Sequence, residues 1–296
     1  MSSSLKSALW MLLASLNFAL LNTLVKFLSV DFHLSQIIFF RSFFAVIFIL
    51  PWVFNSGIKS LKTNSVKLQI VRCSLAVLAM YLWFYSISKI PLAEATAINF
   101  TAPIFGAIFA IFLLKEKIRS RRIFAILISL IGALIIIRPG LIEVNLFILT
   151  TLIASILMGM ASVYIKKITL IDHPNAVVFY MPMVLTLVSF IPCIIFWKSP
   201  NFISIIFLIS TGITAFLAHV CITKAFSFSD ATFVLVFDYL RLPFTSVFAF
   251  FLFGEITSFW IWIGGLIIFL SSIYVAYRER KTSSKQSATL ITAKRL

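Results

Sequence analysis

Charged residues are scarce in this sequence, and acidic residues are the scarcest of them. Only 11% of its 296 residues are charged, and nine aspartates and glutamates stand against 25 lysines and arginines. Hydrophobic residues make up 61% of the chain. An average soluble domain has about a quarter of its residues charged. The composition therefore excludes an ordinary soluble domain and predicts a protein that contacts the lipid bilayer.

The positive charge has no polar domain to carry it. A net charge of +16 would suit a nucleic-acid partner if the basic residues were concentrated on a folded polar unit. No polar segment of this chain is long enough to form one. We therefore expect no nucleic-acid partner.

Cysteine and histidine are also rare, with three residues of each. Cys73, Cys193 and Cys221 lie within or at the ends of apolar runs, lack the spacing of metal ligands, and are typical of small packing residues. The sequence has no GxxxxGK phosphate loop, and no two carboxylates share one apolar run. We expect no disulfide, no metal site, no cofactor and no enzymatic activity.

Apolar runs recur along the chain between short charged or turn-rich breaks. Crossing a hydrocarbon core takes roughly 20 helical residues. The fifth run is short, but Arg122 and Arg138 flank it and can reach the headgroups from either end. The sequence predicts an all-α membrane protein with ten transmembrane helices, whose expected spans are Ala8–Leu28, Leu34–Phe54, Ile70–Ile87, Leu92–Leu114, Ile123–Ile137, Leu146–Tyr164, Val177–Trp197, Phe202–Ile222, Ala231–Phe253 and Phe259–Tyr277.

Basic residues gather between alternate runs. If the N-terminus is cytoplasmic, 19 lysines and arginines fall on the cytoplasmic side, Arg72 among them, and four fall outside. The remaining two, Arg41 and Arg241, lie inside expected spans. Cytoplasmic loops of membrane proteins carry such an excess of basic residues. The bias predicts that both termini are cytoplasmic and that residues 280–296 form a solvated tail.

The two halves of the sequence match each other in order. We interpret residues 1–140 and 141–279 as two copies of one five-helix unit. Because five is odd, the second copy enters the membrane from the opposite side, as in carriers that bind substrate between inverted repeats. The matches are Ala14 with Ala154, Ser15 with Ser155, Lys26 with Lys166, His33 with His173, Glu94 with Asp230, Ala95 with Ala231, Thr96 with Thr232 and Glu116 with Glu255.

Three segments carry a resemblance to a known family. They are APIFGAIFAIFLLKE, ending at Glu116, LPFTSVFAFFLFGE, ending at Glu255, and FFRSFFA around Arg41. Over nearly its whole length the chain resembles the EamA-type members of the drug/metabolite transporter superfamily. The resemblance implies a ten-helix carrier of the bacterial inner membrane, with a central cavity, that moves small organic metabolites without ATP.

The two halves are not equal within this pattern. Pro103 follows Ala95 by eight positions, whereas Pro243 follows Ala231 by twelve. The extra residues fall around the sequence FDYLR. We therefore expect the halves to contribute different groups to a site.

Asp238 and Arg241 lie near the middle of the ninth run. At 1.5 Å per residue they are about 12 and 16 Å from its cytoplasmic end, a depth at which a charge faces protein or a water-filled cavity. At spacing i, i+3 they share a helix face with Thr245. Two interpretations stay open: a self-neutralising ion pair, or a pair that opens to bind a zwitterion, with arginine on its carboxylate and aspartate on its amine. Tyr239 joins this candidate set.

Three asparagines are further candidates. Asn99 shares a narrow face of the fourth run with Ala102 and Gly106, and its amide needs a partner across a helix interface or in a cavity. Asn22 and Asn17 interrupt the first run. We expect them to face the transport pathway, with simple helix packing as the alternative.

Aromatic residues and one arginine complete the candidates. Tyr81, Trp83 and Tyr85 could stack on a planar substrate, although 16% of the chain is aromatic and placement toward lipid is the simpler interpretation. Arg41 could extend toward the headgroups or pair with a carboxylate such as Glu94.

These observations predict a secondary transporter that moves a small polar or zwitterionic organic metabolite by alternating access. The metabolite would be amino-acid-like, S-adenosylmethionine-like or similar, and a homodimer is left open. The alternatives are a flippase for a lipid-linked substrate or a small-solute channel on the same scaffold. Asp238 and Glu94 are the candidate proton carriers.

Overall fold

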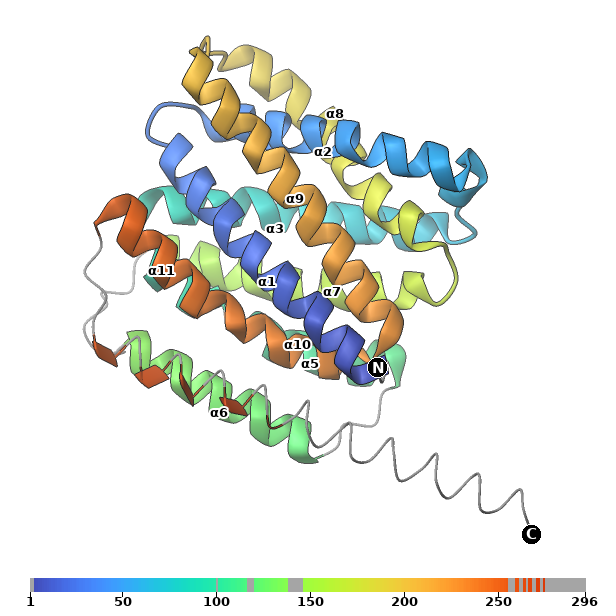
Figure 1. Ribbon diagram of the computed structural model, residues 1–296, viewed down its shortest axis with the longest axis vertical. Coiled ribbons are helices and arrows are strands. Elements are labelled where there is room, and N and C mark those ends of the chain that lie inside the picture. The colour runs from blue at the N-terminus through green and yellow to red at the C-terminus, as the bar shows by residue number, and fades with distance from the viewer. Residues whose placement is uncertain are drawn as a thin grey trace.

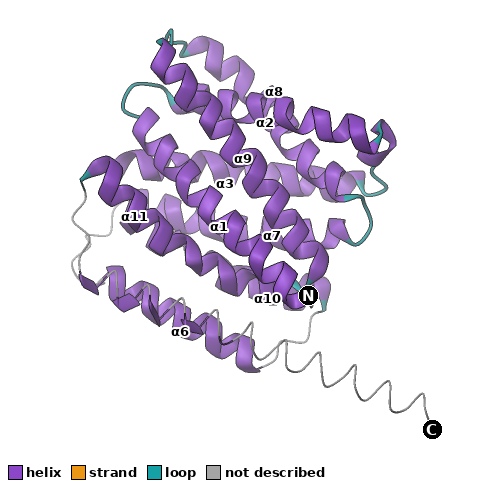
Figure 2. Cartoon of the chain, in the orientation of Figure 1, coloured by secondary structure: helices purple, strands orange, loops and turns teal. Residues whose placement is uncertain are grey.

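The computed structural model describes residues 3–99, 101–115, 120–137 and 146–254, together with part of the segment 259–274. Every element in these residues is a helix, and no strand occurs among them (Figure 2). In chain order the elements are α1 (Ser3–Leu28), α2 (Leu34–Ser56), the 3-10 helix η1 (Ile58–Leu61), α3 (Val66–Lys89), α4 (Leu92–Asn99), α5 (Ala102–Leu114), α6 (Ser120–Ile137), α7 (Leu146–Thr169), α8 (Pro174–Ile195), α9 (Phe202–Phe228), α10 (Ala231–Val236), the 3-10 helix η2 (Phe237–Leu240) and α11 (Arg241–Phe253).

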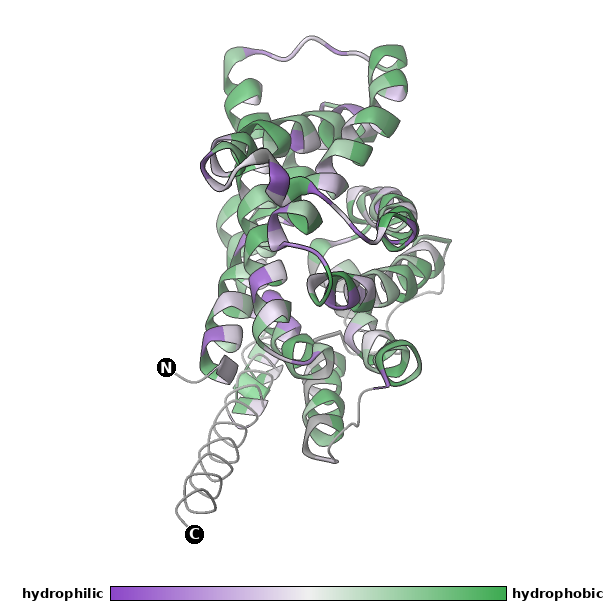
Figure 3. Cartoon of the chain, turned by 90° about the vertical axis from the view of Figure 1, so that its right-hand side faces the viewer, coloured by the Kyte–Doolittle hydropathy of each residue, from purple (hydrophilic) through white to green (hydrophobic). Residues whose placement is uncertain are grey.

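Seven helical segments in the described residues are long and apolar enough to cross a membrane: α1, α2, α3, α7, α8, α9 and a composite segment, Phe233–Phe253. Large apolar side chains point away from the protein, as Phe112, Phe202 and Phe251 do with exposed fractions of 74%, 77% and 78%. The helices are mostly apolar along their length (Figure 3). This all-helical structure fits a membrane protein. The tenth expected span lies largely outside the described residues, so the count of ten stays a prediction.

Several helices extend beyond their expected ends. Helix α9 continues to Phe228, past the expected end at Ile222, and α3 starts at Val66 rather than Ile70. Lys224 does not end α9, because its long side chain places the ammonium 4.4 Å from the centroid of the Trp10 ring.

The expected fourth and ninth helices are interrupted, whereas the sequence predicted both to be continuous. Helix α4 ends at Asn99 and α5 begins at Ala102, while η2 separates α10 from α11. Pro103 and Pro243 lie in the first turns of α5 and α11. A proline lacks the backbone N–H and clashes with the carbonyl four residues earlier. The interruptions follow, because those carbonyls belong to Asn99 and to Tyr239 in η2.

Corresponding helices of the two halves begin in the same way. His33 precedes α2 and His173 precedes α8, both in extended conformation. Each imidazole Nδ1 accepts a hydrogen bond from a backbone N–H of the first turn, that of Ser35 at 3.3 Å and that of Asn175 at 3.2 Å. Such a bond satisfies a donor that has no partner within the helix.

The helices of one half of the sequence pack mainly on those of the other. Helix α1 contacts α9 and α11, α7 contacts α3 and α5, and α2 contacts α8 and α9. Figure 1 shows α1 and α9 side by side. A backbone-to-backbone contact joins α5 to α7, where a Cβ at Gly159 would lie 2.6 Å from the Ala102 oxygen and 2.7 Å from the Gly106 nitrogen. Gly106 is thus a packing residue.

Candidate substrate cavity

A cavity of about 130 Å³ lies among the helices of both halves. At about 30 Å³ for each water molecule in the liquid, it has room for about four water molecules. Apolar side chains form much of its wall, and both helix interruptions border it. The polar and charged residues on the wall are Asn22, Arg41, Arg72, Asn99, Ser162, His219, Asp238 and Arg241.

Asp238 and Arg241 form an ion pair on this wall. The Arg241 Nη2 donates to Asp238 Oδ1, and only 11% and 8% of the arginine and aspartate side chains are exposed. Because η2 replaces a regular helical turn, the aspartate lies in η2 and the arginine begins α11. The guanidinium carbon lies 5.1 Å from the centroid of the Phe18 ring, at cation–π distance. In this structure the two side chains are therefore paired with each other.

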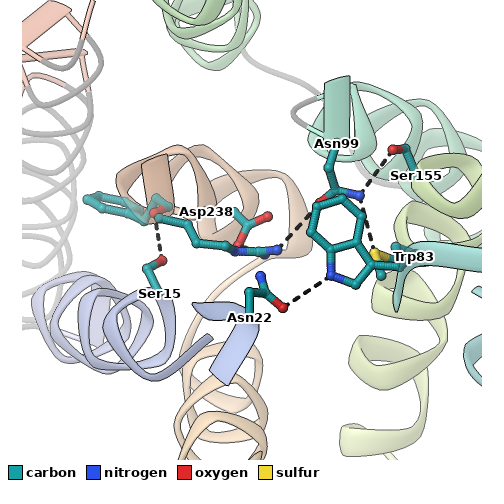
Figure 4. Close-up of polar contacts among 9 residues, drawn as sticks. Ser15, Asn22, Trp83, Asn99, Ser155 and Asp238 are labelled. Carbon is teal, nitrogen blue, oxygen red and sulfur yellow. Dashed lines mark hydrogen bonds and ion pairs between the residues drawn. The ribbon is translucent and has the colours of Figure 1, made fainter. Parts of the chain in front are cut away.

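Asn99 connects this pair to the other interruption. Its Oδ1 accepts a hydrogen bond from Arg241 Nη1 at 3.4 Å, and its Nδ2 donates to Ser155 Oγ at 3.0 Å and lies 3.3 Å from Met158 Sδ. One amide therefore bridges α4, α7 and α11. Both partners that the sequence left open, an interface and a cavity, are present here (Figure 4).

Asn22 and Trp83 form a second polar contact on the wall. The indole Nε1 donates to Asn22 Oδ1 at 3.1 Å, and both residues are buried. The bond joins α1 to α3. Nearby, Ser15 Oγ donates to the Phe237 carbonyl at 3.2 Å and satisfies backbone exposed by the interruption of the ninth helix.

Four candidates lie away from the cavity wall. Asn17 donates to the Leu13 carbonyl of its own helix at 2.8 Å. Tyr239 is fully buried, and Tyr85 is 38% exposed with its ring 5.6 Å from that of Phe147. Tyr81 packs on a hydrophobic cluster.

Helix geometry explains the difference among the α3 aromatics. Residues two positions from Trp83 lie about 200° around the helix. Tyr81 and Tyr85 therefore face away from the cavity when Trp83 faces into it.

Arg41 points inward rather than toward the headgroups. It is 2% exposed and lines the cavity, with Nη1 2.8 Å from Met80 Sδ and Nη2 3.4 Å from His219 Nε2. Its guanidinium carbon lies 5.8 Å from the centroid of the Phe84 ring. The side chain of Glu94, the carboxylate suggested as its partner, lies outside the described residues.

Arg72 and His219 line the cavity although the sequence analysis did not select them. Arg72 was assigned to the cytoplasmic side, but it is 1% exposed within α3 and donates to the Val177 carbonyl at 2.7 Å. The signal was present, since Arg72 and Trp83 lie i, i+11 on one face of α3 and both fall inside the third apolar run. His219 likewise falls within the eighth run.

A protein-family comparison gives two matches to this chain. The model of the EamA-like transporter family matches residues 5–138 and residues 145–277.

Named transporters also align with this chain along most of its length. A riboflavin transporter of Vibrio cholerae is 31% identical, in an alignment that covers 95% of this chain and 96% of the transporter. An S-adenosylmethionine uptake transporter of Rickettsia bellii is 30% identical, and the alignment covers 94% of this chain and 95% of that transporter. The pseudopaline exporter CntI of Pseudomonas aeruginosa is 29% identical, and the alignment covers 90% of this chain and 95% of the exporter.

A solved structure shares the fold. It superposes with a TM-score of 0.77, covering 95% of this chain and 98% of that chain. Their sequences are 14% identical. The likeness extends over both halves of the sequence.

Proposed function

Because the chain belongs to the EamA-like transporter family, we propose that it moves a small polar or zwitterionic metabolite across a bacterial inner membrane by alternating access. The family and the named relatives are transporters rather than enzymes, as the sequence predicted. The observation that carries the proposal is a buried, charged hydrogen-bond network, Asp238–Arg241–Asn99, on a cavity inside an otherwise apolar protein.

The proposed topology has ten spans, built from an inverted pair of five-helix repeats at residues 1–140 and 141–279. The matching caps of α2 and α8 and the packing of α1 and α7 on the opposite half support it. Both termini and the tail at 280–296 lie in the cytoplasm in this proposal. The excess of basic residues on that side persists when Arg72 is removed from it.

The ion pair supplies the chemistry of binding. Paired with each other, Asp238 and Arg241 neutralise their charges, which lowers the cost of burying both. A zwitterion offers an ammonium to the aspartate and an acceptor to the arginine, so it can replace the internal pair without leaving either charge unpaired. Asn99 contacts both α7 and α11, so a change at the pair reaches both halves of the protein.

The named relatives suggest a range of substrates. Riboflavin, S-adenosylmethionine and pseudopaline appear in the names of three proteins that align along most of this chain. All are organic metabolites with several polar groups. We place the solute of this carrier in the same range, with amino-acid-like compounds included.

Uptake into proteoliposomes tests the proposal. A panel of labelled metabolites, including riboflavin, S-adenosylmethionine and amino acids, is offered with and without a pH gradient. We expect Asp238→Asn and Arg241→Ala to slow uptake of the carried compound. Lys198→Gln, which changes an exposed lysine paired with Asp31, should keep the parental rate.

Other outcomes would identify other functions. A carried solute that both cavity variants move at the parental rate would show that the pair does not bind it. Single-channel currents in a planar bilayer would replace the carrier with a channel. Movement of a tagged lipid between leaflets, without competition by soluble metabolites, would replace it with a flippase.

A further inference from the structure

We propose that Arg41 and Arg72, together with His219, form an anion subsite of the cavity, which binds a carboxylate or phosphate group of the transported solute. The inference deepens the proposed function and rests on it. It assigns the anionic group of the solute to two arginines outside the Asp238–Arg241 pair, so that binding this group does not require the pair to open.

Arg41 has no counter-charge among the described residues. Its two Nη atoms contact a thioether sulfur, Met80 Sδ, and an imidazole nitrogen, His219 Nε2. Neither group carries a negative charge, and a thioether is a weak acceptor. The Arg41 Nε, also buried, has no hydrogen-bond partner in the described part of the chain. Within the described part of the chain, the guanidinium is thus buried with its charge uncompensated.

Arg72 is in the same state on the neighbouring helix. Its Nη1 donates to the Val177 carbonyl at 2.7 Å and to Gln69 Oε1 at 3.5 Å, both neutral acceptors. Its Nε lacks an acceptor within the described residues. Ala76 and Met80 follow on the same face of α3 and line the cavity with it.

The charges on the described cavity wall do not balance. Arg41, Arg72 and Arg241 are three cations, whereas Asp238 is the one carboxylate, and it is already paired with Arg241. Burying an uncompensated charge at bilayer depth costs several kcal/mol. A bound anion would offset that cost at both remaining arginines. Guanidinium groups suit this task, since their planar forks match the oxygens of carboxylate and phosphate.

His219 adds a neutral donor to the same region. If its Nε2 accepts from Arg41, the proton of the neutral ring is on Nδ1. That Nδ1 is buried and has no acceptor among the described residues. Two cations and one N–H donor, from α2, α3 and α9, therefore have no anionic acceptor among the residues that the structure describes. This is the arrangement expected of an anion-binding site.

Paired solutes that differ by one anionic group test the subsite. The pairs are S-adenosylmethionine with its decarboxylated form, L-methionine with 3-(methylthio)propylamine, and flavin mononucleotide with riboflavin. The purified full-length protein is used in detergent for thermal stabilisation and in proteoliposomes for uptake. For at least one pair we expect the anionic member to be preferred by about tenfold or more, the effect of a charged hydrogen bond.

Variants assign the preference to these arginines. Arg41→Gln and Arg72→Gln should each remove most of it by weakening the anionic member and leaving its partner unchanged, and Arg41→Lys should retain part. Lys198→Gln is the control. Without solute, both glutamine variants should melt at or above the parental temperature, because each removes an uncompensated charge. A drop in melting temperature as large as that of Asp238→Ala would instead show that these arginines are structural and would overturn the proposal.

The remaining arms separate the ways in which the inference can fail. Inorganic phosphate should compete with the anionic member of a pair. If phosphate instead enhances uptake of the partner that lacks the anion, a separate co-ligand fills the site and the proposal is wrong. Equal uptake of both members overturns the subsite alone and leaves the carrier intact. If the parental protein moves no solute of any pair and none stabilises it, the proposed function fails for this substrate range, and the subsite fails with it.

Discussion

The two interrupted segments beside the cavity, α4–α5 and α10–η2–α11, resemble each other in backbone and differ in charge. Each breaks a few residues before a proline, and each places polar groups on the cavity wall. The first presents the neutral Asn99, whereas the second presents Asp238 and Arg241. The interruption is therefore a shared feature of the scaffold, and the charged pair is an addition made in one half only.

The difference indicates how two segments of similar backbone contribute unequal groups to one cavity. The step of twelve positions from Ala231 to Pro243 accommodates η2, while the step of eight positions from Ala95 to Pro103 accommodates only a short break. The longer segment can place two charges on the wall within one 3-10 turn. The shorter one contributes an amide that bonds to them. Variants that treat the two segments unequally will test this interpretation.

Asp238→Ala should have the largest effect on stability. It leaves the Arg241 guanidinium buried with only Asn99 and the Phe18 ring as described partners, and breaking a buried ion pair from one side costs about 3–5 kcal/mol. Asn99→Ala, the matched change in the other segment, should cost about 1–3 kcal/mol, as expected for a buried polar group left unsatisfied. Thermal unfolding in detergent, followed by tryptophan fluorescence, measures both.

A double variant separates pairing from packing. Asp238→Ala combined with Arg241→Ala removes both charges and should recover a large part of the stability lost by Asp238→Ala alone. Equal losses for the Asp238 and Asn99 single variants would contradict the unequal roles assigned to the two segments.

Gly159→Ala should cause the next largest loss of stability. With its control in α1, it tests whether α7 packs more closely than α1 does. The added methyl group would meet the backbone of α5 at two points, Ala102 O and Gly106 N, and neither can move without displacing the helix. We expect a loss of about 3 kcal/mol, the upper end of the usual range for overpacking. The corresponding residue of α1 is Ala19, which already has a Cβ in a fully buried position.

Ala19→Gly is the control for this change. It should cost about 1 kcal/mol, the penalty for glycine in a helix interior. Thermal unfolding compares the two variants directly. If Gly159→Ala were as mild, the close approach of α5 and α7 would not limit packing, and the two halves would be more alike than the structure indicates.

Hydropathy predicts much of this fold because the bilayer restricts it. A run of apolar residues about 20 long can hardly be anything but a helix when no water is present to satisfy its backbone. The interruptions were not predicted, because Pro103 and Pro243 lie within strongly apolar sequence and prolines are tolerated in membrane helices when neighbouring groups satisfy the backbone. Here Ser15 does so at Phe237.

Charge and polarity predicted cavity residues better than aromatic character did. Asp238, Arg241, Arg41, Asn99 and Asn22 all line the cavity, because lipid offers no partner to a charge or an amide. An aromatic ring can pack equally well against lipid, the protein core or a solute. Composition alone therefore could not show that Trp83 lines the cavity while Tyr81 and Tyr85 do not.

One cavity residue was missed because of its position along the chain. Arg72 is the third residue of its expected span, and a basic residue so near a loop is normally assigned to the membrane surface. The start of α3 at Val66 places Arg72 well within the helix rather than at its end. Whether a residue of α3 lines the cavity depends on where the helix begins and on which face of the helix the residue lies. Hydropathy defines neither.

Asp172→Asn should cause a smaller loss of stability. Asp172 lies in the loop before α8, and Asp31, in the loop before α2, provides the comparison. Asp172 is 5% exposed and accepts hydrogen bonds from the Asn64 backbone at 2.9 Å, from Ser65 Oγ at 2.6 Å and from Thr63 Oγ1. It thereby fixes the loop after α7 to the start of α3. Burial alone raises the pKa of this carboxyl, but the hydrogen bonds outweigh burial and the pKa is lowered overall. Losing the charged acceptor should cost about 1–2 kcal/mol.

The lowered pKa predicts how the effect of Asp172→Asn on stability changes with pH. A carboxyl with a depressed folded-state pKa stabilises the protein above its unfolded pKa, near the ordinary aspartate value of 3.8, and that contribution is lost as pH falls through the lower folded value. The stability gap between parent and Asp172→Asn should therefore be full at pH 6 and shrink below pH 4. Asp31, in the loop before α2, pairs with Lys198 at 3.6 Å while both side chains are more than half exposed. Asp31→Asn should cost at most about 1 kcal/mol, less at high salt, as expected of a surface pair. A gap for Asp172→Asn that stayed constant down to pH 3 would show that its hydrogen bonds do not depend on the charged carboxylate.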